Sequence, residues 1–345
     1  MGTMQLSSRP AIHADFEAFF IGLKDTYGYG EEARERLAHE WRMLRKNPST
    51  ISLIIEDSSR VAEERCVAYA QAVFVTEALV HRLTTNMPPC VNLHLETELP
   101  DGGPAILPPA DVTVANSGPG LNVLFTHWGW YESRLTEEEA VRVREFLLRS
   151  FLTSYRGFKL KELFLEVFGE MARQMTLNAG FRQRSDYEDY FQSNDAPPAD
   201  LRPYLMGVSR QEAISCEGSL VSQAFVYSRP RFFFRPHEQE MLCQAIRGIP
   251  DEEIANALCI TVPAVKKRWI SIYDRVSEAC SDLLPPTPEG SRGAEKRRVL
   301  IQYLHDHQEE LRPVQAPPRL DKNGRERLEP DRKSPTNGAR HTRPT

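Results

Sequence analysis

The stretch Phe234–Val276, FRPHEQEMLCQAIRGIPDEEIANALCITVPAVKKRWISIYDRV, predicts three short helices separated by two tight breaks. Apolar residues recur at helical spacing in its first part, and Gly248–Pro250 ends that helix. Asp251 is expected to cap a second helix, and glutamates follow in the first turn, where the helix dipole favours them. Thr261 is expected to cap a third helix, and Pro263 is compatible with the first turn of that helix. A helix, a turn and a helix with a basic start is the arrangement that probes the DNA major groove.

The third predicted helix has one apolar stripe and one polar side. The stripe, Val265, Trp269 and Ile272, is predicted to face the interior of the bundle. The other predicted interior residues are Leu242, Ile254, Ala255 and Leu258. The polar side is the predicted DNA-binding surface. Its members are Lys266 and Lys267, expected at base edges, Arg268 and Arg275, expected at phosphates, and Ile270 and Ser271.

A dozen residues of this stretch follow one family pattern without a gap: Pro236, Glu238, Glu240, Gly248, Glu253, Ile254, Ala255, Leu258, Val265, Lys266, Ile272 and Tyr273. The segment resembles the C-terminal module of LuxR-type regulators, which implies binding to double-stranded DNA. The sequence departs from the family at Ala264, where a hydroxyl residue is usual, and at Ile270, where a second basic residue is common. Glu252 also replaces a usual lysine.

Charge makes the predicted DNA affinity of one copy modest. Six basic and six acidic side chains lie between Arg235 and Arg275, whereas DNA binding depends strongly on phosphate neutralisation. The alternative for this segment is a helical bundle used for protein contacts, which no longer binds DNA.

The composition excludes several other classes of protein. The chain has 345 residues, enough for two domains, and a formal net charge of −5, so it is no generic polycation. Its six cysteines form no CxxC pair, which argues against a disulfide framework or a metal site. No signal-peptide core and no apolar run of about 20 residues is present. We therefore expect a cytoplasmic protein without a membrane segment.

Residues 1–191 are predicted to alternate helices and strands in a layered α/β domain with one mainly antiparallel sheet. Expected helices carry Phe16–Leu23, Leu37–Leu44, Thr136–Thr153 and Glu170–Asn178, expected strands are Ile51–Glu56, Cys66–Val75, Leu121–Trp130 and Leu160–Phe168, and Phe181–Phe191 is expected to be extended. Thr136 and Glu139 match a capping box. Residues 82–118, rich in Pro, Gly and Asn, are predicted to be irregular.

This order of elements resembles the fold of the GCN5-related N-acetyltransferases (GNAT), with Glu166-Val167 and Ala179-Gly180-Phe181 as local matches. The resemblance implies an acetyltransferase-like domain. The family's glycine-rich cofactor loop is absent, because Tyr131–Leu135 has no glycine and three glutamates follow Thr136. We therefore expect no catalytic residue, no cofactor and no enzyme activity. The alternative is an N-acetyltransferase with a fused regulatory helix-turn-helix.

A candidate ligand pocket is expected at the end of the central strand. Its residues are His127, Trp128, Trp130 and Glu166, because indole and imidazole rings suit a small aromatic or cationic ligand. The alternatives are that the two tryptophans belong to the core and that Glu166 is an ion-paired structural carboxylate.

The predicted fold class is α+β, followed by an all-α helix-turn-helix domain and a disordered tail. The predicted boundaries are a sensor domain at 1–191, a linker at 192–233, a DNA-binding domain at 234–285, a helix at 286–311 and a disordered tail at 312–345. The predicted function is a LuxR-type transcriptional regulator. Its predicted partners are double-stranded DNA, a small-molecule effector and a second copy of the chain.

Overall fold

The computed structural model describes residues 4–27, 30–45, 49–98, 105–216, 218–286 and 294–316. Residues up to Val314 belong to one compact unit. The predicted disordered tail lies outside the described residues from position 317 onward. Among the described residues, no helix is long and apolar enough to span a membrane.

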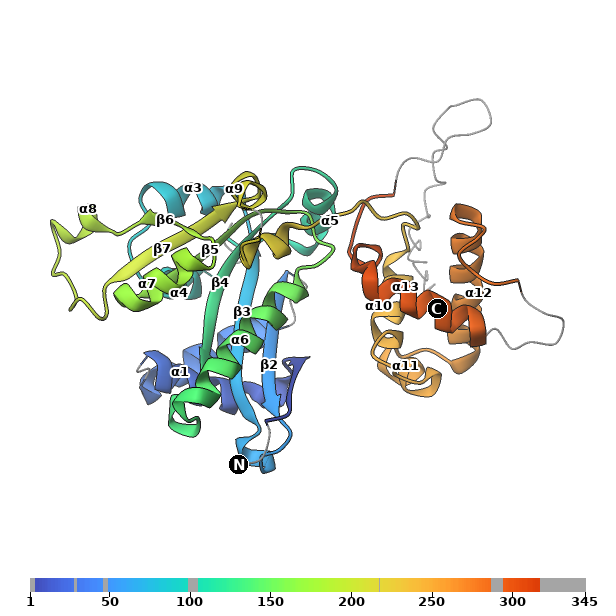
Figure 1. Cartoon of the computed structure of the whole chain (residues 1–345), viewed down its shortest axis with the longest axis horizontal. Coiled ribbons are helices and arrows are strands. Elements are labelled where there is room, and N and C mark those ends of the chain that lie inside the picture. The colour runs from blue at the N-terminus through green and yellow to red at the C-terminus, as the bar shows by residue number, and fades with distance from the viewer. Residues whose placement is uncertain are drawn as a thin grey trace, which may run out of the picture. The chain divides into compact units, whose positions relative to one another are not determined.

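One sheet of seven strands organises the first two thirds of the chain (Figure 1). The strands are β1 (Leu6–Pro10), β2 (Thr50–Asp57), β3 (Cys66–Val75), β4 (Leu121–Trp130), β5 (Leu160–Phe168), β6 (Arg182–Ser185) and β7 (Pro203–Ser209). Their order is β1-β2-β3-β4-β5-β7-β6, and every pair is antiparallel except β4 with β5. The expected α/β domain with a mainly antiparallel sheet is therefore confirmed.

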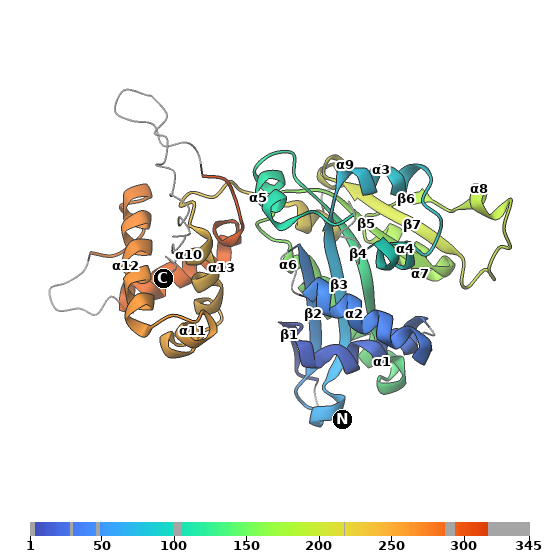
Figure 2. The ribbon, with the colours of Figure 1, turned by 180° about the vertical axis from the view of Figure 1, so that it is seen from behind.

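Helices cover both faces of the sheet, because successive side chains of each strand point to opposite faces and both faces are apolar. On β2, Leu53 and Ile55 enter the core beneath α6 (Glu137–Ser154) and α7 (Gly169–Asn178). Ile54 points the other way, toward α1 (Phe16–Tyr27) and α2 (Arg34–Arg45). Figure 2 shows α1 and α2 in front of the strands.

The region 82–118 is not irregular as predicted. It contains the end of α3 (Glu77–Thr85) and all of α4 (Val91–Glu98) and α5 (Pro109–Ser117). The Thr76 side chain caps α3, and a proline begins α5, so local signals for helix starts were present. The helices have no more than nine residues each, which is too short for a periodic pattern to outweigh the Pro and Gly content.

The predicted linker at 192–233 is also corrected, because it contains a strand inside the sheet. β7 pairs with β5 on one side and β6 on the other. It is followed by α9 (Arg210–Ser215) and a 3-10 helix, η6 (Val221–Phe225), while α8 (Glu188–Phe191) replaces the end of the extended segment expected at 181–191. Met206 and Val208 of β7 lie in the main core. The domain built on the sheet therefore continues beyond residue 191.

Four α-helices follow among the described residues: α10 (Pro236–Ala245), α11 (Asp251–Ala257), α12 (Val262–Ala279) and α13 (Ala294–Asp306). Thr261 caps α12 as expected, since its side chain accepts from the Ala264 N–H. Asp251 is the first residue of α11 and not its cap; Pro250 holds that position. Leu300 and Leu304 of α13 lie in the same core as α10–α12, so α13 belongs to the bundle.

Short 3-10 helices complete the described fold: η1 (His13–Asp15), η2 (Glu31–Ala33), η3 (Ala62–Glu64), η5 (Glu132–Arg134) and η7 (Gln308–Leu311). Of these, η5 joins β4 to α6, and η7 follows α13.

Candidate functional site

The two central parallel strands, β4 and β5, separate part-way along the sheet. Their pairing runs from Leu121 with Leu160 to Phe125 with Leu165 and then stops, although both strands continue. At the same point β4 bulges against β3, since His127 is opposite Gln71 and Phe125 is opposite Ala72, which leaves Thr126 without a partner. Beyond Phe125 and Leu165, the facing edges of β4 and β5 are therefore not paired with each other.

The start of α4 bridges the two strands where they separate. The side-chain amide of Asn92 donates to the Thr126 carbonyl of β4. The backbone N–H groups of Cys90 and Val91 each donate to the Glu166 carboxylate of β5 at 3.0 Å. α4 thus fixes Glu166 beside the bulge, and Asn92 is a site residue that the sequence analysis missed because it lies in the region predicted to be irregular.

Glu166 has a raised pKa, near neutral pH. Burial raises its pKa from the ordinary value of 4.5 to about 7, against the opposing effect of Tyr187 and of the two backbone N–H donors. Both protonation states are therefore populated at physiological pH, which is the condition that suits a general acid or base. The structure places this carboxylate at a helix start and not in an ion pair.

The four residues of the predicted pocket do not gather in one place. His127 lies on the α1 side of the sheet, buried edge-to-face against Phe19 and 3.6 Å from Glu40. Trp128 and Trp130 pack toward the opposite core in a T-shaped pair 6.4 Å apart. Glu166 shares the sheet face of His127 but contacts α4. Successive residues of a strand alternate between faces, so a pocket built from adjacent positions was not available.

The start of α6 is closed by its own side chains. Thr136 and Glu139 form the predicted capping box, with Oγ1 accepting from the Glu139 N–H at 3.3 Å and Oε2 accepting from the Thr136 N–H at 2.9 Å. Arg60 donates to Glu139 and to the Arg134 carbonyl at 3.1 Å and 2.9 Å, and pairs with Asp57 at 3.1 Å. A cavity of about 580 Å³ adjoins this junction.

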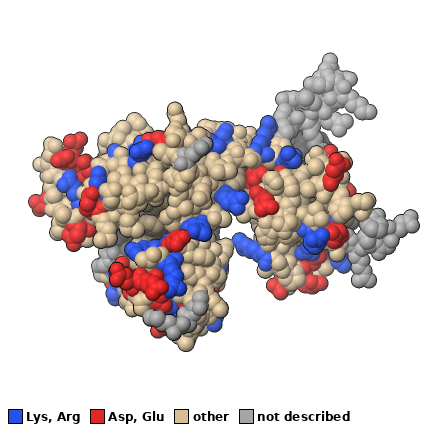
Figure 3. Space-filling view, viewed as in Figure 1, with Lys and Arg blue, Asp and Glu red and all other residues tan. Residues whose placement is uncertain are grey.

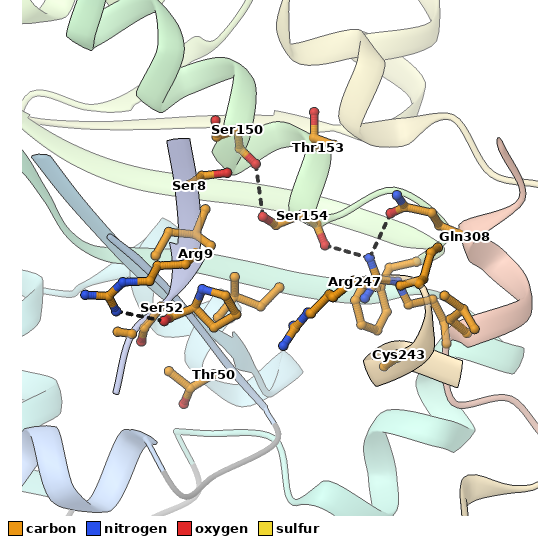
Figure 4. Close-up of a pocket in the computed structure, with 18 of the residues that line it drawn as sticks. Ser8, Arg9, Thr50, Ser52, Ser150, Thr153, Ser154, Cys243, Arg247 and Gln308 are labelled. Atoms are coloured by element: carbon orange, nitrogen blue, oxygen red, sulfur yellow. Dashed lines mark hydrogen bonds between the residues drawn. The ribbon is translucent and has the colours of Figure 1, made fainter. Parts of the chain in front are cut away.

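A second cavity, of about 730 Å³, lies near the other end of α6 (Figure 4). Four arginines line it, but Arg9 pairs with Asp15 and Glu56, and Arg149 pairs with Glu145. Because carboxylates already balance part of its basic lining, we assign it no ligand.

Arg312 lies at the edge of this second cavity and binds the end of α6. It donates to the carbonyls of Ser154 and Arg156, both at 2.9 Å, and its guanidinium lies 4.4 Å from the Phe158 ring centroid. A cation is favourable at the carboxyl end of a helix. Arg312, expected to begin the disordered tail, therefore has fixed contacts.

The predicted DNA-binding residues divide into exposed and engaged side chains. Lys266, Lys267 and Ile270 are exposed on α12. Arg268 donates to the His237 carbonyl at 3.3 Å. Ser271 and Arg275 both bind the buried carboxylate of Glu238, at 2.9 Å and 3.1 Å, so they stabilise the bundle. Figure 3 shows acidic and basic atoms interspersed over the helices on the face in view.

The predicted interior of the bundle lies inside it. Six of the seven residues are buried and Leu258 packs against them in part; the buried ones are Leu242, Ile254, Ala255, Val265, Trp269 and Ile272. The indole N–H of Trp269 donates to Asp251 at 3.3 Å, and the Arg297 guanidinium lies 4.6 Å from the indole centroid.

Comparisons with solved structures find a condensation domain, N-acetyltransferases and an N-acyl amino acid synthase. The C-terminal condensation domain of Ebony in complex with beta-alanyl-dopamine is 13% identical, with a TM-score of 0.40 over 60% of this chain and 100% of its own. Spermidine/spermine N-acetyltransferase SpeG from Vibrio cholerae is 10% identical, with a TM-score of 0.35 over 62% and 97%. FeeM, an N-acyl amino acid synthase from uncultured soil microbes, is 10% identical, with a TM-score of 0.34 over 61% and 96%.

The sheet-based part of this chain has an α+β fold with a mainly antiparallel seven-stranded sheet. No protein-family model and no curated protein matches the chain. None of the three structures is a LuxR-type regulator.

The solved structures found by the comparison are enzymes, which runs against the prediction that this chain is not one. The absence of the glycine-rich loop argues only against binding the family's cofactor through that loop. Its absence does not exclude acyl transfer.

Proposed function

We propose that the GNAT-like domain is a cytoplasmic acyltransferase that moves an acyl group from a thioester to an amine where β4 and β5 separate. The observation that carries this proposal is the Glu166 carboxylate, held beside the bulge of β4 with its pKa raised to about 7 by burial. A general base of this strength removes a proton from an amine at neutral pH without remaining permanently protonated.

Glu166 acts as the general base in this proposal. The amine nitrogen attacks the thioester carbonyl carbon, and its proton passes to the Glu166 carboxylate. The carbon–sulfur bond then breaks, and the thiol leaves with a proton returned from Glu166. Asn92 is a positioning residue, since its bond to the Thr126 carbonyl holds the start of α4, and with it Glu166, against β4.

Activity of the full chain tests the proposal. Purified protein is incubated with acyl thioesters and a panel of amines, and thiol release and the mass of the acylated amine are measured. We expect Glu166→Gln to lower kcat by roughly a hundred- to ten-thousand-fold, the usual contribution of a general base. Glu63→Gln is the matched control, because Glu63 is exposed on η3, far along the chain from Glu166. Equal rates for both variants would contradict the assignment of the base.

DNA binding by the helical bundle is a second candidate function. It is favoured by Lys266, Lys267 and Ile270, which are exposed on one surface of α12 just after the Thr261 cap. The LuxR resemblance supplies the expected geometry, with α12 in the major groove. In this form the protein is a regulator that binds double-stranded DNA as a homodimer, and the GNAT-like domain binds its small-molecule effector.

Capture of genomic DNA fragments by the full chain, followed by titration of an enriched fragment, tests this second function. Lys267→Ala is expected to weaken specific binding by about 1–3 kcal/mol, the usual scale for a base contact. Lys24→Ala is the control, since Lys24 is exposed on α1. If no fragment is enriched, or if both variants bind equally, α12 is not the reading helix.

A further inference from the structure

We infer that the acyl donor is a thioester on a pantetheine arm that the protein recognises without a nucleotide. This inference rests on the proposed acyl transfer and specifies its donor. It comes from the junction between β4 and α6, where side chains of this protein occupy the place that a nucleotide diphosphate would need at a helix start.

A diphosphate at a helix start needs backbone N–H groups that it can approach closely. The junction Tyr131–Leu135 has a side chain at every position and closes into the 3-10 turn η5, so it lacks the glycines that permit such an approach. The Glu139 N–H already donates to the Thr136 hydroxyl, and the Glu139 carboxylate occupies the Thr136 N–H. Two of the donors at this helix start are therefore satisfied internally.

The charges at the same place also oppose a diphosphate. The first turn of α6 carries Glu137, Glu138 and Glu139, and burial does not neutralise the last of these, because hydrogen bonds from Thr136 lower its pKa. Three carboxylates at one helix start repel a ligand that brings two or more negative charges.

The nearby guanidinium groups are already committed. Arg60 is shared between Asp57 and Glu139. Arg134 lies over the Tyr131 ring, 4.5 Å from its centroid, and donates to the Cys66 carbonyl. The cavity beside the junction is lined by these two arginines and by the Asp57 and Glu139 carboxylates, so its charged lining balances. A phosphate there would have to displace ion pairs that the fold already makes.

An acyl-pantetheine donor avoids these costs, because it is uncharged and has no diphosphate to place at the start of α6. The test compares acetyl-CoA with acetyl-pantetheine as donors for the full chain, with adenosine 3′,5′-bisphosphate as a competitor. We expect the two kcat/KM values to agree within about threefold and the bisphosphate not to inhibit, because the nucleotide adds no favourable contact. A preference of a hundredfold or more for acetyl-CoA, or inhibition by the bisphosphate at micromolar concentration, would overturn the inference while leaving acyl transfer intact. Turnover of neither donor would refute the proposed function itself.

A charge substitution tests the same inference independently. Glu137→Lys removes one of the three carboxylates without touching the capping box and should raise kcat/KM for acetyl-CoA, relative to acetyl-pantetheine, by roughly three- to tenfold. Glu145→Lys, an equal charge change on the third turn of the same helix, should leave the ratio unchanged. Equal effects of the two substitutions would show that the first turn of α6 does not face the donor.

Discussion

Replacing Glu166 by glutamine should change how the stability of this protein depends on pH. Burial raises the pKa of Glu166 from 4.5 to about 7 in the folded protein, so the folded state holds a proton that the unfolded chain releases. Stability therefore falls as pH rises between about 4.5 and 7, and the loss persists above that range. The difference between the two pKa values corresponds to about 3 kcal/mol. Glutamine does not titrate, so the variant should lack this part of the pH dependence.

Urea unfolding at pH 5 and pH 8 measures the effect. The free energy of unfolding of the wild type, minus that of Glu166→Gln, should fall by about 2–3 kcal/mol between these two values. Taking the difference cancels the titration of every other group. At pH 5 the variant should be the less stable protein. The glutamine side chain has an acceptor oxygen for only one of the Cys90 and Val91 N–H groups, because its NH2 group cannot accept. The exposed control Glu63→Gln should give a pH profile of stability parallel to that of the wild type. A parallel profile for Glu166→Gln as well would refute the reasoning.

Three further predictions concern the helical bundle, each checked by urea or thermal unfolding. Trp269→Ala should destabilise the bundle by about 3–5 kcal/mol, since the indole is 5% exposed. The control Ile270→Ala, at an exposed position, should change stability by less than about 0.5 kcal/mol. If Trp269→Ala melts like the wild type, Trp269 lies outside the core. Cys259→Gly should stabilise by about 1 kcal/mol, because Cys259 has φ 52° in the turn before α12, and a loss of stability would show that its side chain packs there. Glu238→Ala should cost about 3–5 kcal/mol, because it leaves the Arg275 guanidinium without its buried partner, and a neutral result would mean that Arg275 turns to solvent.

The long elements of this fold are predictable from local patterns, and the short ones are not. β4, β5 and α6 follow from sustained apolar patterns or a capping box and lie within one residue of the expected ranges. β7 lies in the stretch that the sequence predicts as a linker, because seven residues beginning with proline carry little periodic signal. Its place between β5 and β6 is decided by long-range pairing, which single-sequence patterns do not contain.

The candidate site shows the same limit. The sequence predicts Glu166 as a pocket residue but does not predict its neighbours, because Val91 of α4 contacts it across 75 residues of chain. His127 and Trp128 are adjacent in sequence and were grouped into one pocket, although the pleat sends them to opposite faces. The bulge at Thr126, which marks the point where the strands separate, has no sequence signal of its own.

The pH profile of kcat/KM for acyl transfer to an amine, measured for the wild type and for Glu166→Gln, tests the central proposal most directly. The wild-type rate should rise with pH through an apparent pKa of about 7, as Glu166 loses its proton and becomes able to act as a base. The variant should be slower and should lack that rise. The same rise in both proteins, or no acyl transfer by the wild type with any thioester and amine, would contradict the account.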